Sequence, residues 1–287
     1  VVDDASADDL AAALAPFRGR IAFFRHERNM GLSATRNTGV RHATGEILAF
    51  LDADDWWPEG FLQDVVPQVA RGSAVCYDNY IVAESELGRA EIGTEGRQTL
   101  LATWRSTGPR RLCRENMDLI ISIPSLFKIL VHRGDFALAS GYHEGLRDAE
   151  DFHFCMKLLA HDIGLTIDLE HRGFYLVRST SLLRSIERSA QRQLEALAAW
   201  RRMFEEMPRT LPLPEKTRRE CRRLSRYYQG RYADALFRHH WHTRHFREMT
   251  RAPFLRTALP AIPAVLGVKG RGLVRRLGSR RAARLRA

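Results

Sequence analysis

Residues 46–55 read Glu46-Ile47-Leu48-Ala49-Phe50-Leu51-Asp52-Ala53-Asp54-Asp55, an apolar run followed at once by carboxylates. A run of this kind is typical of a strand buried on both faces, and ligands bind in open α/β sheets at the carboxyl ends of such strands. Two carboxylates one residue apart need a positive partner. Because hard oxygen ligands suit Mg²⁺ or Mn²⁺, we expect Asp52 and Asp54 to meet a divalent cation that carries a diphosphate. The alternative is a loop that opens the next helix, with Asp55 as N-cap and Pro58 near the first turn.

Three further motifs surround this one in a fixed order. The chain opens on Val1-Val2-Asp3-Asp4-Ala5-Ser6, continues through Asn29-Met30-Gly31-Leu32-Ser33-Ala34-Thr35-Arg36-Asn37, and later reaches Glu150-Asp151. With residues 46–55, these segments match the patterns VDDxS, NxGxxxxRN, GExIxFLDxDD and ED. Over residues 1–181 the chain therefore resembles the family-2 glycosyltransferases with the GT-A fold. The resemblance implies an α/β fold, in which helices flank a Rossmann-like sheet that binds a nucleotide sugar.

The resemblance also implies a role for individual residues on the donor side. Asp54 would ligate Mn²⁺ or Mg²⁺, with Asp52 as a second ligand or a contact to the ribose or donor sugar. Asn29 and Arg36 would contact the nucleotide and its phosphates, and Asp4 would contact the nucleobase. The alternatives are a solvated helix-face position for Arg36 and an Asx-turn or N-cap role for Asp3, Asp4 or Ser6. Both can hold at once, with Asp3 structural and Asp4 on the base.

Glu150 and Asp151 begin a predicted helix whose apolar positions recur at helical spacing, at Phe152, Cys155, Met156 and Leu159. Acidic residues at a helix N-terminus are stabilised by the helix dipole, so a capping arrangement with Asp148 is one interpretation. The resemblance implies another, in which Asp151 is the general base and Glu150 orients it. One carboxylate base without a covalent nucleophile implies inversion at the anomeric carbon.

The segment after this helix departs from the family pattern YRxHxxSxS. Tyr175 and Ser181 match, but Leu176 stands at the arginine position and Arg178 at the histidine position. An arginine there can serve only the phosphates of the donor, so Arg178 is a predicted donor-binding residue. This departure, and a chain start inside the VDDxS motif, favour the alternative of a catalytically silent family member that acts as a scaffold or binding subunit. Because members carry a strand and helix before that motif, we expect the sequence to be a fragment or its start to be misplaced.

Composition narrows the class of protein further. The four cysteines are far apart, which argues against a zinc site or a disulfide framework and fits a reducing cytosol. The net charge is +11, but ten basic residues and no acidic ones lie after Thr250, which leaves residues 1–250 at +1. No signal peptide is visible, and the longest apolar stretch, residues 258–268, is too short to span a bilayer.

The basic tail contains Leu273, Val274 and Leu277 among arginines. Segments of this kind lie on anionic membranes or bind nucleic acid. We expect the membrane surface, because it suits enzymes with lipid-linked acceptors, and a disordered basic tail is the alternative. A histidine group, His239, His240, His242 and His245, is expected to be a solvated or interface helix face, since no carboxylate or cysteine completes a metal set.

The pattern along the chain predicts three parts: a GT-A domain over residues 1–182, N-terminally incomplete, a helical appendage over 183–250, and the tail over 251–287. Within the domain we expect a parallel-type sheet, with helices over 8–14, 32–43 and 59–71 and strands over 21–25, 46–51 and 74–82. The predicted function is a metal-dependent, inverting transfer of bacterial type from a nucleotide sugar, in the first place a UDP-sugar, to a cell-envelope polysaccharide or glycolipid. We expect a cytoplasmic protein, peripheral at the inner face of the membrane, that does not bind nucleic acid.

Overall fold

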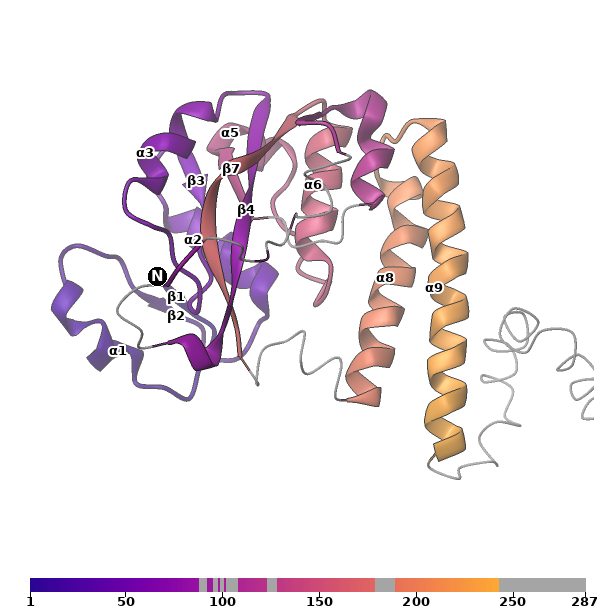
Figure 1. The fold of residues 1–287 in the computed structure, drawn as a ribbon, viewed down its shortest axis with the longest axis horizontal. Coiled ribbons are helices and arrows are strands. Elements are labelled where there is room, and N and C mark those ends of the chain that lie inside the picture. The colour runs from indigo at the N-terminus through magenta and orange to yellow at the C-terminus, as the bar shows by residue number, and fades with distance from the viewer. Residues whose placement is uncertain are drawn as a thin grey trace, which may run out of the picture. The chain divides into compact units, whose positions relative to one another are not determined.

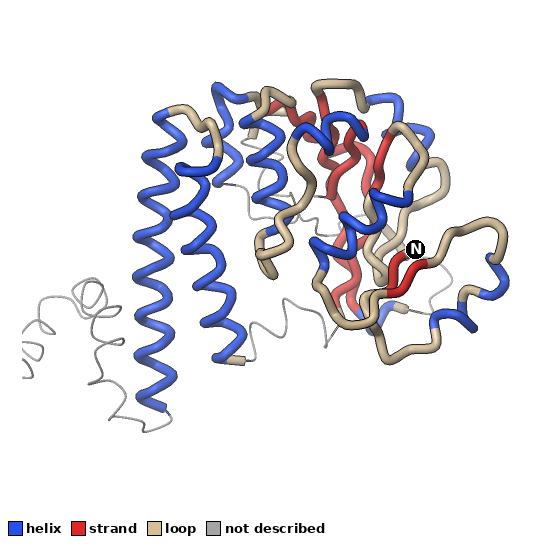
Figure 2. The backbone as a smooth tube through the Cα atoms, turned by 180° about the vertical axis from the view of Figure 1, so that it is seen from behind, coloured by secondary structure: helices blue, strands red, loops and turns tan. Residues whose placement is uncertain are grey.

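The computed structural model describes residues 1–87, 92–94, 98, 101, 108–122, 128–178 and 189–242 (Figures 1 and 2). The chain divides into two compact units. The first comprises Val1–Ser181 with Met207–Arg218, and the second comprises Leu182–Glu206 with Arg219–Ala287. Every strand of the described part lies in the first unit, as does every predicted site residue. The α/β class is confirmed.

The larger sheet of the first unit has five strands in the order β3-β6-β4-β7-β5 (Figure 1). Their bounds are Ile47–Ala49 for β3, Ser73–Ala83 for β4, Arg111–Leu112 for β5, Lys128–His132 for β6 and Gly164–Val177 for β7. Only β4 and β7 pair in parallel; the other three pairs are antiparallel. The predicted parallel-type sheet is therefore right for β3, β4 and β7, which run in one direction, and wrong for β5 and β6, which run against them. Parallel neighbours require a crossover that returns the chain to the same end of the sheet, and β6 instead enters between β3 and β4 against both.

The strand of the opening motif is also less buried than predicted. In this sheet β3 is an edge strand that pairs only with β6. Leu48 is buried, but Ala49 and Leu51 are exposed. Burial on both faces is therefore wrong for β3 in the described structure, although its carboxyl end still carries the predicted loop.

The N-terminal segment forms a separate two-stranded parallel sheet, β1 (Val2–Asp3) with β2 (Phe24–Arg25). The link between them contains α1 (Leu10–Ala13) and a 3₁₀ turn, η1 (Ala15–Phe17). The Arg25 guanidinium donates to the buried Asp3 carboxylate over 2.8 Å, which ties the two strands together. Asp3 therefore has a structural role, and Asp4, the next residue, lies just past the end of β1.

Helix bounds follow the predictions where no proline intervenes. Helix α2 (Leu32–His42) begins after Gly31, whose φ of +90° favours glycine. The predicted helix over 59–71 is shorter, because Pro67 lacks the N–H that would continue it: α3 (Phe61–Val65) passes into the 3₁₀ turn η2 (Val66–Gln68). Two further 3₁₀ segments are η3 (Glu84–Glu86) and η4 (Arg114–Ser122).

Helices α5 (Arg133–Leu138) and α6 (Glu150–Ala160) complete the first unit. In Figure 1, α3 and α6 lie on either side of the sheet. Every residue of α6 is buried, so this helix is surrounded rather than laid on a surface. On the α3 side, a core cluster of Phe61, Val65, Val75, Tyr77 and Leu130 packs with Trp57 and anchors the segment that follows the carboxylate loop.

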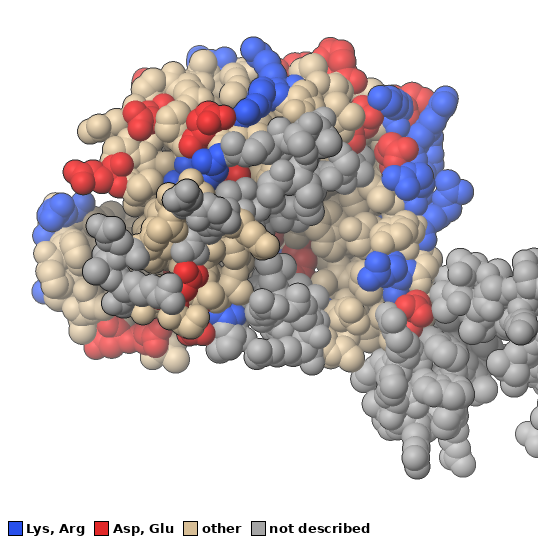
Figure 3. Space-filling view, viewed as in Figure 1, with Lys and Arg blue, Asp and Glu red and all other residues tan. Residues whose placement is uncertain are grey.

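The second unit contains most of α8 (Ala190–Thr210) and α9 (Glu215–His242). Trp200 and Phe204 of α8 stack on Tyr228 of α9, with ring centroids 5.6 and 5.7 Å apart. The exposed face of α9 is basic, and Figure 3 shows Lys and Arg gathered there; its exposed members include Arg219, Arg222, Arg223 and Arg226. Across the described residues, none of the helices has the length and apolar character needed to cross a membrane.

Candidate active site

The loop after β3 is held by cations from two other elements. Asp52 accepts a hydrogen bond from Arg36 Nη2 of α2 over 3.0 Å, and its other oxygen accepts from Lys128 Nζ of β6. Lys128 also donates to Asp55 over 2.6 Å. Asp55 is buried and accepts from the backbone N–H of Leu176 in β7. The N-cap of α3 is Gly60, so the N-cap role considered for Asp55 is wrong.

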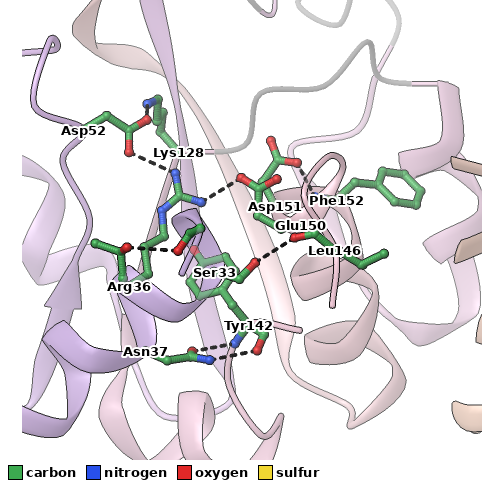
Figure 4. A network of polar contacts seen from close by, with 12 residues as sticks. Ser33, Arg36, Asn37, Asp52, Lys128, Tyr142, Leu146, Glu150, Asp151 and Phe152 are labelled. Carbon is green, nitrogen blue, oxygen red and sulfur yellow. Dashed lines mark hydrogen bonds and ion pairs between the residues drawn. The ribbon is translucent and has the colours of Figure 1, made fainter. Parts of the chain in front are cut away.

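Arg36 joins this loop to the N-terminus of α6. Its Nη1 donates to Glu150 Oε1 over 3.0 Å while its Nη2 holds Asp52, as Figure 4 shows. The Arg36 side chain is only 12% exposed, and its guanidinium lies 5.1 Å from the centroid of the Tyr142 ring. The alternative of a solvated helix-face arginine is therefore wrong, because Arg36 is a buried bridge between two carboxylates.

The charges of this network shift the pKa values of its carboxyl groups in opposite directions. Burial alone would raise the pKa of Asp52, but Arg36 and Lys128 lower it to about 2. Burial and the neighbouring Asp151 raise the pKa of Glu150 to about 7, against the opposing effect of Arg36. Asp52 is therefore firmly ionised, whereas Glu150 changes its charge near neutral pH.

Asp151 is the second residue of α6 and is buried beside Glu150. One of its oxygens accepts the backbone N–H of Phe152 over 2.7 Å, which orients the carboxylate at the helix start. The N-cap is Ala149, in the left-handed conformation at φ +65° and without a side-chain cap. The residue at the N-cap position is therefore Ala149 and not Asp148.

The segment before α6 is fastened to α2. Asn37 Nδ2 donates to the carbonyl of Tyr142, and the Tyr142 N–H donates back to Asn37 Oδ1, both over 2.9 Å. Ser33 Oγ donates to the carbonyl of Leu146 over 3.3 Å (Figure 4). One helix, α2, thus positions both Arg36 and the approach to Glu150 and Asp151.

Asp4 and Asn29 lie at the turn that precedes α2. The Asp4 carboxylate accepts the backbone N–H groups of Met30 and Gly31, each over 2.7 Å, and contacts His26 Nδ1 over 2.7 Å. Asn29 donates to the Asp4 carbonyl over 3.3 Å. These bonds join Asp4 to a turn 26 and 27 residues further along the chain, so they are neither the Asx-turn nor the N-cap role considered for it. A cavity of about 340 Å³ lies in this region, lined by His26, Met30, Thr38 and Arg41 among others.

The remaining predicted residues are placed less fully. Arg178 is exposed, one residue past the end of β7, and the structure does not bring it into the network of Asp52, Arg36 and Glu150. Ser181, the side chains of the histidine group and the tail after Thr250 lie outside the described residues.

The carboxylates of this loop suit a metal ion that is also bound by the phosphates of a substrate. In the part of the chain that the structure describes, there is no group of three His, Cys, Asp or Glu that could hold a metal alone. Asp54 is half-buried between Asp52 and Asp55, and its carboxylate makes no hydrogen bond or ion pair to the described residues. Mg²⁺ and Mn²⁺ are commonly held by one or two carboxylates and the phosphates of a substrate. Asp54 fits that role, whereas both oxygens of Asp52 are already held.

Sequence reasoning missed the contribution of Lys128 and the partner role of Asp55. The signal for Lys128 is a single charge in the strand Lys128-Ile129-Leu130-Val131. A lysine in such a run is almost never buried unless it is paired, and carboxylates at the end of an adjacent strand are natural partners. The pairing of β6 with β3, which brings them together, could not be read from one sequence.

Comparison with known proteins identifies the family of this chain. The family model described as glycosyl transferase family 2 matches residues 1–148, just over half of the chain. The chain belongs to glycosyltransferase family 2, as the sequence motifs predicted. Its α/β architecture with helices flanking a central sheet is that of a GT-A glycosyltransferase.

Curated relatives match shorter stretches. The putative glycosyltransferase EpsH of Bacillus subtilis is 32% identical over 92 residues, which cover 31% of this chain and 26% of EpsH. An uncharacterized glycosyltransferase of Haemophilus influenzae is 25% identical over 159 residues, 55% of this chain and 51% of that protein. The chain thus spans between about a quarter and a half of the length of these relatives.

Solved structures share the fold at low sequence identity. Staphylococcus aureus TarS 1–349 in complex with UDP-GlcNAc has a TM-score of 0.55 at 17% identity, over 92% of this chain and 70% of that one. The mannosyltransferase PcManGT of Pyrobaculum calidifontis, in complex with GDP-Man and Mn²⁺, has a TM-score of 0.51 at 18% identity, over 99% and 70%.

The raised pKa of Glu150 predicts a pH-dependent effect of the Glu150→Gln substitution. A carboxyl group whose folded-state pKa exceeds its unfolded value contributes stability below the unfolded pKa and loses it as pH rises through the folded pKa. For Glu150 that window runs from about 4.5 to about 7. Glu150→Gln should therefore raise the melting temperature relative to the parent at pH 8.5 more than at pH 5. A melting-temperature difference that is the same at both values would contradict this assignment.

Proposed function

We propose that this protein is a metal-dependent, inverting glycosyltransferase. It would move a sugar from a nucleotide-sugar donor, in the first place a UDP-sugar, to a cell-envelope polysaccharide or a lipid-linked acceptor. The observation that carries the proposal is the Arg36 bridge, which holds Asp52 and Glu150 at once, each over 3.0 Å. It brings the carboxylates after β3 and those that begin α6 into one site.

On the donor side, Asp54 would hold Mn²⁺ or Mg²⁺, and the cation would neutralise the diphosphate leaving group. Asp52, kept ionised by Arg36 and Lys128, would accept hydroxyl groups of the ribose or sugar. Asp4 and Asn29 would bound the nucleobase side of the site, and Arg178 would reach the phosphates. These roles extend the donor complexes named for TarS and PcManGT to this chain.

On the acceptor side, Asp151 would take the proton from the attacking hydroxyl, as a general base must do within about 3 Å of its target. Its burial and its bond to the Phe152 N–H hold the carboxylate in one orientation. Glu150, which accepts a hydrogen bond from Arg36, would orient this base. A single carboxylate base acting on an acceptor hydroxyl inverts the anomeric centre.

The acceptor class is supported by a named relative. WfgD of Escherichia coli is described as a UDP-Glc:alpha-D-GlcNAc-diphosphoundecaprenol beta-1,3-glucosyltransferase, and it is 32% identical over 82 residues, 28% of this chain and 32% of WfgD. A lipid-linked acceptor of that kind would place this protein in the cytoplasm, peripheral at the inner face of the cell membrane.

A nucleotide-sugar screen tests the proposal. The full-length protein should gain thermal stability from one UDP- or GDP-sugar in the presence of Mn²⁺, because a ligand that binds only the folded state raises its melting temperature. The same donor should then be hydrolysed slowly without acceptor. Stabilisation without any hydrolysis or transfer would favour the catalytically silent family member instead, for which the doubly held Asp52 is the specific observation.

The basic tail is predicted to bind anionic vesicles and to release them with salt. Its ten basic residues have no acidic neighbours after Thr250, and each near a charged surface contributes up to ~1 kcal/mol. Such attraction is screened within about 8 Å at physiological ionic strength. Co-sedimentation of the full-length protein should therefore exceed that of a version ending at Thr250. Equal pelleting of both versions, or pelleting that salt does not change, would contradict this prediction.

A further inference from the structure

Lys128 is a buried cation at the centre of the proposed site. It begins β6, the strand between β3 and β4, and its side chain is 7% exposed. Its ammonium donates to Asp52 and, over 2.6 Å, to Asp55. The Tyr175 ring of β7 lies 5.6 Å from the ammonium. One lysine therefore contacts two of the three carboxylates of the loop.

The two carboxylates that Lys128 holds lie on either side of Asp54. Asp52 is additionally held by Arg36, and Asp55 by the N–H of Leu176. Asp52 and Asp55, which flank Ala53 and Asp54, are therefore fixed to α2, β6 and β7. The Asp54 carboxylate itself makes no bond to the described residues. The arrangement keeps one carboxylate available and uses the other two to hold the loop.

Electrostatics explains why this arrangement requires a cation. Asp55 has an exposed fraction of 9%, and an unpaired carboxylate at such a position is costly. An internal ammonium offsets that cost whether or not a metal ion is present. Removal of one partner from a buried ion pair usually destabilises strongly, because the other charge is left uncompensated.

We propose that Lys128 is a positioning residue for sugar transfer: it fixes the Asp52–Asp55 loop so that Asp54 is the carboxylate presented to the metal–diphosphate group. This inference rests on the proposed function. Groups that orient a metal ligand in this way typically change metal affinity by ~10–100-fold when they are mutated. The same ammonium explains why Asp52 is a poor candidate for a direct metal ligand.

The test measures binding of Mn²⁺ with UDP by calorimetry on the full-length protein. Lys128→Met, which keeps the chain length but removes the charge, should weaken this binding by ~10–100-fold. Because Lys128→Met alone can fail to fold, the double variant Lys128→Met with Asp55→Asn restores the buried charge balance. It should recover the parent melting temperature and still bind Mn²⁺–UDP weakly.

The matched control is Lys157→Met. Lys157 is a second buried lysine, on α6, and its ammonium donates to the carbonyls of Ser140 and Gly141 rather than to a carboxylate. This variant should keep parent Mn²⁺–UDP affinity. A folded double variant with parent affinity would overturn the role of Lys128. If the parent protein binds Mn²⁺–UDP but transfers no sugar, the proposed function is refuted. The binding measurement would still decide the role of Lys128.

Discussion

Replacement of Asp151 by Asn is expected to lower turnover of the full-length protein by ~10²–10⁴-fold, the range for a lost general base. Affinity for the nucleotide-sugar donor should barely change, because the base acts on the acceptor hydroxyl. Asn keeps the size of the side chain and can still accept the Phe152 N–H through its amide oxygen. The effect should therefore appear in kcat, with the folded structure retained.

Asp162→Asn is the matched control, two residues past the C-terminal end of the same helix. Asp162 forms an exposed ion pair with Arg114 over 3.1 Å, and such pairs contribute little to stability. Its φ of +60° is a conformation that Asn tolerates. Steady-state kinetics should show parent turnover for this control. Near-parent turnover of Asp151→Asn as well would remove Asp151 from the mechanism.

Replacement of Asp54 by Asn should abolish the gain in donor affinity that Mn²⁺ provides. Mn²⁺ is a hard cation that binds carboxylate oxygen, and loss of the ligand charge weakens the site. Because the Asp54 carboxylate makes no bond to the described residues, the fold should not change. Calorimetric titration of UDP with and without Mn²⁺ measures the difference directly.

Asp64→Asn provides the control for a lost negative charge near this loop. Asp64 is exposed on α3, ten residues further along the chain. It should leave the Mn²⁺-dependent affinity unchanged. If Asp54→Asn bound Mn²⁺ and UDP as tightly as the parent, the metal assignment would be wrong.

Local patterns predicted much of the fold around the site. The motif Asn29–Asn37 predicted α2 to within one residue, and Glu150-Asp151 begins α6 as expected. These elements are defined by glycine, capping and apolar spacing, which act between neighbours in sequence. The direction of β6 was not predictable in this way, because strand pairing is decided by contacts between residues about 80 positions apart, such as Leu48 and Val131.

The candidate site shows the same difference between residues predicted from local motifs and residues brought in by long-range strand pairing. Asp52, Arg36 and Glu150 were each predicted from their own motifs, and the structure brings these three together. Lys128 belongs to no motif and acts only because β6 pairs beside β3. Asp4 illustrates a different gap: its position was predicted, but its bonds to the Met30 and Gly31 N–H groups depend on a turn 26 residues away.

The left-handed conformation of Ala149 has a consequence for how far this protein can be stabilised. A non-glycine residue in that conformation costs roughly 1–2 kcal/mol, and Ala149 at φ +65° directly precedes Glu150 and Asp151. Glycine at position 149 would remove this strain, yet it would also free the backbone that aims both carboxylates. Under the proposed mechanism, stability and turnover are therefore opposed at position 149, and selection for thermostability alone would favour a more stable but slower protein.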